Sequence, residues 1–127
     1  MYPSIPEPTM DSPDTLQALR DALRAFVAER DWDQFHAPKS LAMSVMIEAA
    51  ELGEHFQWCR TGTADELPGD ARERIGLEMA DVLLYLVRLA DKLDIDLADA
   101  TWRKLELNAR KYPVEKAKGR STKYTEL

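Results

Sequence analysis

Apolar residues recur at every third or fourth position in four long segments of the chain, the spacing that lines one side of an α-helix. The first segment runs from Ser12 to about Arg30. The others are predicted over residues 40–58, over residues 71–93, and from just after residues 94–96 to a point before Pro113. No segment alternates convincingly as a strand does, so the sequence predicts an all-α fold, a four-helix bundle.

Length and composition restrict the possible domain organisation, partners and cellular setting of the chain. The 127 residues fit one domain, predicted over residues 12–112, with a flexible tail at 1–11 and a polar tail at 113–127. A net charge of −6 argues against a nucleic-acid partner. The single cysteine suits a reducing, cytoplasmic setting, and no apolar run reaches the roughly 18 residues that cross a membrane.

Carboxylates interrupt the apolar stripes of the second and third helices. On a helical wheel Glu48 falls inside the stripe of the second helix, and Glu51 lies one turn along at its edge. The third helix repeats this arrangement, with Glu78 inside its stripe and Asp81 at the rim. Each helix therefore carries an acidic pair at positions i and i+3, with the leading acid pointing inward.

Such a cluster of buried acids requires compensation by positive charge. Four close carboxylates repel one another, and burial of each unpaired charge is costly unless a cation or a proton neutralises it. Mg²⁺ prefers oxygen ligands, and we predict a Mg²⁺ site here. A di-iron site is disfavoured because neither histidine has a Glu three positions before it. The alternative is an acidic, solvated surface without metal.

The fourth helix and several aromatic residues add candidate contacts for a ligand. Lys104, Asn108 and Lys111 align on one helical face and are suited to bind phosphate oxygens, although a solvated face is the alternative. Aromatic rings stack readily on a nucleobase, but they also serve as core or interface residues. The candidates for stacking are Trp32, His36, Trp58 and Tyr85.

Five stretches of the chain resemble the MazG-like superfamily of all-α nucleoside triphosphate pyrophosphohydrolases, in particular its dCTP pyrophosphatase branch. They are ERDWDQFHAPKSL, IEAAELGEHFQW, EMADVLLYLV, KLELNARKYP and KYTEL, within residues 16–127. The resemblance implies a MazG-like bundle and a homo-oligomer, a tetramer or at least a dimer. It implies Mg²⁺-dependent hydrolysis of a nucleoside triphosphate, most of all dCTP or a modified dCTP, to monophosphate and pyrophosphate. It also implies metal ligands at Glu48, Glu51, Glu78 and Asp81, phosphate contacts at Lys104, Asn108 and Lys111, and base or sugar contacts at Trp32, His36, Trp58 and Tyr85.

The attacking water needs a residue that orients or deprotonates it. Glu51, with Glu48 as the alternative, is the candidate because its place at the edge of the stripe leaves it partly solvated. Leu23 stands where cytosine-selective members carry a histidine, so base preference stays open. The competing hypotheses are a broad-specificity nucleotide pyrophosphatase, an all-α dUTPase, and a helical interaction module without enzymatic activity.

Overall fold

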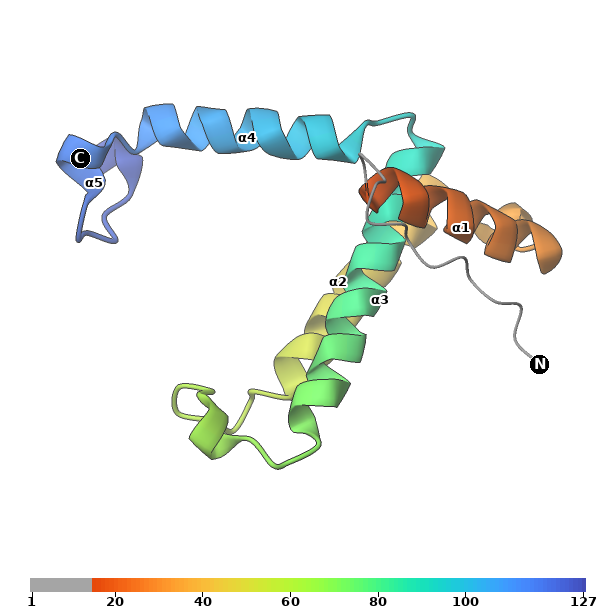
Figure 1. Ribbon diagram of the computed structural model, residues 1–127, viewed down its shortest axis with the longest axis horizontal. Helices are drawn as coiled ribbons and strands as arrows, with labels where there is room; N and C mark the ends of the chain where they lie inside the picture. The colour runs from red at the N-terminus through yellow and green to blue at the C-terminus, as the bar shows by residue number, and fades with distance from the viewer. Residues whose placement is uncertain (1–14) are drawn as a thin grey trace. The chain divides into compact units, whose positions relative to one another are not determined.

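The computed structural model describes residues 15–127, and every regular element in that range is helical (Figure 1). The predicted all-α class is therefore confirmed for the described residues. These residues form two compact units, one ending at Ile95 and the other spanning Asp96–Leu127. The predicted helix start at Ser12 and Pro13, and the predicted tail at 1–11, lie outside the described residues.

The first unit is built around a pair of antiparallel helices. It contains α1 (Thr15–Glu29), the 3₁₀ turn η1 (Asp33–Phe35), α2 (Pro38–Glu54), the 3₁₀ turn η2 (Ala64–Glu66) and α3 (Ala71–Lys92). Figure 1 shows α2 and α3 side by side, and both α1 and α2 contact α3. The buried apolar side chains come from all three helices and form the core, namely Val27, Leu41, Ala71, Ile75, Val87 and Ala90.

Helix α2 differs from its predicted bounds at both ends. It starts at Pro38, because proline fits a first helical position where its missing N–H is not needed. It ends at Glu54, four residues before the predicted end at Trp58. The N–H of Phe56 donates to the carbonyl of Gly53 at 3.0 Å and the N–H of Cys59 to that of Phe56 at 3.0 Å. These short-range bonds tighten the chain into turns and replace the last predicted turn of the helix.

Glu66 organises the loop that returns the chain from α2 to α3. Its carboxylate accepts hydrogen bonds from the backbone N–H groups of Arg60 at 2.6 Å, Thr61 at 2.9 Å and Gly62 at 3.2 Å. These donors lower the pKa of Glu66 to about 2. Gly62 has a φ of +77°, and a Cβ there would lie 2.7 Å from the ring of Phe56. These contacts hold the first part of the loop, residues 60–66, in a defined conformation.

The second unit holds the fourth predicted helix. Helix α4 (Leu97–Lys111) begins after Asp96, whose side chain accepts from the N–H of Asp99 at 3.0 Å, and it ends just before Pro113. The region expected to be a polar tail contains two further short elements, α5 (Val114–Ala117) and η3 (Tyr124–Glu126). Within residues 15–127, none of the helices has the length and apolar character needed to traverse a membrane.

Candidate metal centre

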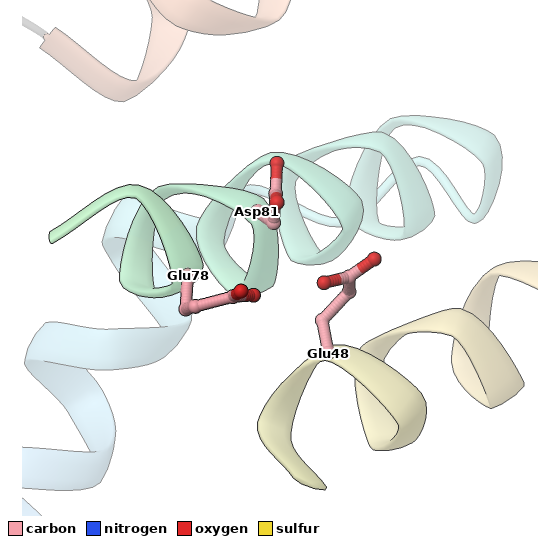
Figure 2. Close-up of side chains that lie close together, drawn as sticks. All are labelled: Glu48, Glu78 and Asp81. Carbon is pink, nitrogen blue, oxygen red and sulfur yellow. The ribbon is translucent and has the colours of Figure 1, made fainter. Parts of the chain in front are cut away.

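Three carboxylates from the two paired helices converge between α2 and α3. Glu48 lies on α2, and Glu78 and Asp81 lie one helical turn apart on α3. One oxygen from each of the three lies within 4.8 Å of the other two. Figure 2 shows the side chain of Glu48 reaching from α2 toward the two acids of α3. Carboxylate oxygens at this separation have room to share one cation.

The burial of these acids follows the pattern predicted from the helical wheels. The leading acids Glu48 and Glu78 are half-buried, whereas Glu51 and Asp81 are exposed. Oε2 of Glu48 and Oε2 of Glu78 are both shielded from solvent and have no hydrogen-bond partner among the described residues. Shielded carboxylate oxygens without a donor are unusual in folded proteins, and a bound cation is one explanation for them. The donor set therefore fits a hard divalent metal ion.

The electrostatics of Glu48 reflect this crowding. The pKa of Glu48 is raised to about 7, first by removal of its carboxylate from water and then by the hydrogen bond and negative charge of Glu51. The negative charges of Asp81 and Glu78 contribute to the same shift. A metal ion bound here would displace the proton of Glu48 and offset the negative charges that contribute to its raised pKa.

Glu51 and His55 border the three converging acids. Glu51 was predicted as a fourth ligand. It lies against Glu48 but does not belong to the group whose oxygens are mutually close. His55 was not among the predicted site residues, and its Nε2 lies 3.9 Å from Oε1 of Glu78. Its position seven residues after Glu48 puts it on the same helical face, and that spacing was the signal available in the sequence.

The four predicted base or sugar contacts occupy different environments in the first unit. Trp32 precedes η1, and its ring lies edge-on to Phe26 with centroids 5.7 Å apart. His36 follows η1 and its Nδ1 accepts a hydrogen bond from Nε of Arg88 at 3.1 Å. Trp58 is 91% exposed in the turn after α2. Tyr85 is half-buried on α3, one turn beyond Asp81.

The three predicted phosphate contacts all belong to α4 in the second unit. Asn108 is half-buried, whereas Lys104 and Lys111 are exposed. Nζ of Lys111 lies 4.8 Å from the centroid of the Tyr124 ring, a cation–π contact within that unit. A place for these side chains beside the carboxylates remains a prediction.

Comparison with known proteins places this site in a family. The model of the MazG-like family matches residues 43–127, which include all three converging acids. The chain belongs to the MazG-like family. This confirms the family predicted from the sequence.

Two curated relatives and one crystal structure extend the MazG-like comparison. The chain is 43% identical to dCTP pyrophosphatase 1 of Homo sapiens, over 96% of this chain and 69% of the relative. It is 42% identical to dCTP pyrophosphatase 1 of Bos taurus, over 94% of this chain and 72% of the relative. The crystal structure of a pyrophosphatase from Archaeoglobus fulgidus matches with a TM-score of 0.68 and 42% identity, covering 84% of this chain and 99% of that one.

Proposed function

We propose that this MazG-like protein hydrolyses dCTP to dCMP and pyrophosphate with Mg²⁺ as its metal ion. The name of its curated relatives, dCTP pyrophosphatase 1, supports both the reaction and the nucleotide. The carboxylates of Glu48, Glu78 and Asp81 are the observation that carries the proposal, because they supply a site for the metal that such a reaction uses. The chain is accordingly a nucleoside triphosphate pyrophosphatase.

The choice of Mg²⁺ follows from the chemistry of the donors. The three converging side chains offer only oxygen, and Mg²⁺ is bound in proteins mainly by carboxylates and retained waters. We place Glu48, Glu78 and Asp81 as direct ligands, with Glu51 beside them. When bound, Mg²⁺ offsets negative charge on phosphoryl oxygens and lowers the pKa of bound water.

The protein's own residues then position the reactants. The oxygen of a water molecule attacks the α-phosphorus, and pyrophosphate leaves with the β- and γ-phosphates. Glu51 is exposed at the edge of the acidic group, where its carboxylate can orient this water or accept its proton. In this proposal Lys104, Asn108 and Lys111 bind the phosphates. The aromatic side chains of Trp32, Trp58 and Tyr85, together with His36, border the base or sugar.

A nucleotide panel tests the proposed activity. Pyrophosphate and orthophosphate release are measured from dCTP, 5-methyl-dCTP, CTP, dUTP, dTTP, dATP and dGTP with Mg²⁺. We expect pyrophosphate from dCTP at the highest kcat/KM and no orthophosphate. Similar values for all nucleotides would favour a broad-specificity enzyme, and a preference for dUTP would favour a dUTPase. Absence of pyrophosphate from every nucleotide would contradict the activity and favour an interaction module.

We also propose that the chain works as a homo-oligomer, with a tetramer favoured over a dimer. Large apolar side chains on both central helices remain exposed to an extent that is unusual for a monomer, among them Met43, Met46, Ile47, Leu77, Met79 and Leu83. A second copy that covers them would remove this apolar surface from water. Sedimentation equilibrium should give a mass of several 14.5 kDa chains, and a monomer at micromolar concentration would contradict the proposal.

A further inference from the structure

A buried arginine binds one of the proposed nucleotide contacts directly. Arg88 lies on α3 and is only 7% exposed. Its Nη2 donates to Oδ1 of Asp33 at 2.6 Å, its Nε donates to Nδ1 of His36 at 3.1 Å, and its Nη1 donates to Oδ2 of Asp91 at 3.4 Å. Asp33 lies in η1 and His36 directly follows it, whereas Arg88 and Asp91 belong to α3. Arg88 therefore connects the segment that carries His36 to the helix that carries two of the converging acids.

The hydrogen bond to His36 determines which form of the imidazole is present. An arginine side chain has only donors and stays protonated, so Nδ1 of His36 must offer a lone pair. A neutral ring that accepts at Nδ1 carries its proton on Nε2. Protonation of Nδ1 would break this bond and set two cationic groups against each other. Burial and the charge of Arg88 lower the pKa of His36, with Lys92 acting in the same direction and Asp33 opposing them.

The surrounding charges keep Arg88 in this position. Asp33 also accepts from Nζ of Lys92 at 2.8 Å. Asp91 is itself held by Arg24 of α1 through two hydrogen bonds, from Nε at 2.7 Å and from Nη2 at 2.5 Å. The guanidinium is thus fixed by acids on two elements, and a fixed donor can impose one orientation on the ring it contacts.

We propose that Arg88 is a positioning residue that holds His36 as the neutral Nε2–H tautomer, so that the ring presents a hydrogen-bond donor to an acceptor oxygen of the nucleotide. This inference rests on the proposed function, because His36 is one of the side chains placed beside the base or sugar. The acceptor belongs to the chemical class of base carbonyls and sugar oxygens, which an Nε2–H donor recognises.

Nitrogen-15 NMR of the full chain without nucleotide or metal tests the tautomer independently of activity. The chain has two histidines, so His55→Gln assigns the signals of His36. We expect an unprotonated Nδ1 and a protonated Nε2 in the wild type. In Arg88→Met the Nδ1–H form should appear and the pKa of His36 should rise. Arg88→Gln, which places an N–H donor where Nε of the arginine lies, should restore the wild-type tautomer. Arg74→Met, which removes an arginine of the same helix that pairs with Asp70, is the matched control and should leave the tautomer unchanged.

A proton on Nδ1 of His36 in the wild type would overturn the proposal, as would an identical tautomer distribution in Arg88→Met. The wild-type spectrum decides even if Arg88→Met melts too low for study. Because this measurement needs no substrate, it separates failure of the inference from failure of the proposed function, which the nucleotide panel tests.

Kinetics with dCTP distinguish positioning from a merely structural role. Arg88→Met should raise KM by about tenfold, the effect of one hydrogen bond, with kcat largely retained. If Arg88 acts through His36, the same substitution in a His36→Ala background adds nothing further to KM. Independent effects that multiply in the double variant would show that Arg88 does not act through His36, and would overturn the proposal.

Discussion

Replacing Glu48 with Gln should leave the helices intact and reduce Mg²⁺-dependent pyrophosphate release from dCTP by more than about 100-fold, since loss of a ligand exceeds the effect of losing a supporting contact. The amide is nearly isosteric with the carboxylate but carries no negative charge to bind the ion. In the wild type, Oε2 of Glu48 is one of the two shielded oxygens without a hydrogen-bond partner among the described residues. Asp81→Asn should have a comparable effect. The measurements are kcat/KM for dCTP across a Mg²⁺ titration and circular dichroism for the fold.

Glu54→Gln provides the matched control for this substitution. Glu54 lies on the same helix, is exposed, and does not belong to the converging acids. The control should retain wild-type turnover and wild-type dependence on Mg²⁺. If Glu48→Gln and Asp81→Asn hydrolyse dCTP as fast as Glu54→Gln does, the carboxylates do not form the metal site.

The contribution of Glu48 to the stability of the metal-free protein should fall as the pH rises from about 4.5 to about 7. The pKa of Glu48 is raised from 4.5 to about 7 in the fold, so the folded state binds its proton more tightly than the unfolded chain does. Stability from this group is therefore fully present below pH 4.5 and is lost as the pH rises through the folded pKa. Above that pH the carboxylate of Glu48 is charged, and this charge destabilises the folded state because no cation compensates it. Thermal melts in chelator across this range measure the effect.

Two comparisons make this result specific to Glu48. Glu48→Gln has no carboxyl group to ionise at this position, so its Tm in chelator should exceed that of the wild type at pH 8, and the difference should be larger at pH 8 than at pH 4.5. Addition of Mg²⁺ should raise the Tm of the wild type at pH 8 more than that of Glu48→Gln. An equal increase in both proteins, or a wild-type Tm that does not fall relative to that of Glu48→Gln between pH 4.5 and 7, would contradict the assignment of the shifted pKa.

The spacing of apolar residues predicted the positions of the helices well, because a helix buried along one face needs an apolar residue at every third or fourth position. It failed at helix ends, where single hydrogen bonds decide the outcome. The segment from His55 to Trp58 continues the apolar pattern of α2, yet local turns end the helix at Glu54. Likewise, residues 113–127 are polar, but they include α5 and η3. Polarity indicates an exposed segment without specifying its backbone conformation.

The converging acids were predictable for a similar reason. Glu48 and Glu78 are charged residues at positions where the helical spacing predicts apolar ones, and this exception can be read from the sequence. The partners of Arg88 could not be predicted from the sequence. Asp33 and His36 are separated from it by 55 and 52 positions, and their meeting depends on how η1 packs against α3. A charged residue near the end of an amphipathic helix otherwise indicates only a solvated surface.

The converging acids are supplied entirely by one helical hairpin, α2 and α3 with the loop between them. An ion bound by acids of both helices would link α2 to α3, so separation of the two helices would require release of the ion. Local opening of this hairpin, as measured by amide hydrogen exchange, should then depend on the free metal concentration. The hairpin that supplies the three acids would thereby resist its own opening while the ion is bound, so its lifetime in the folded state should increase with the concentration of free Mg²⁺.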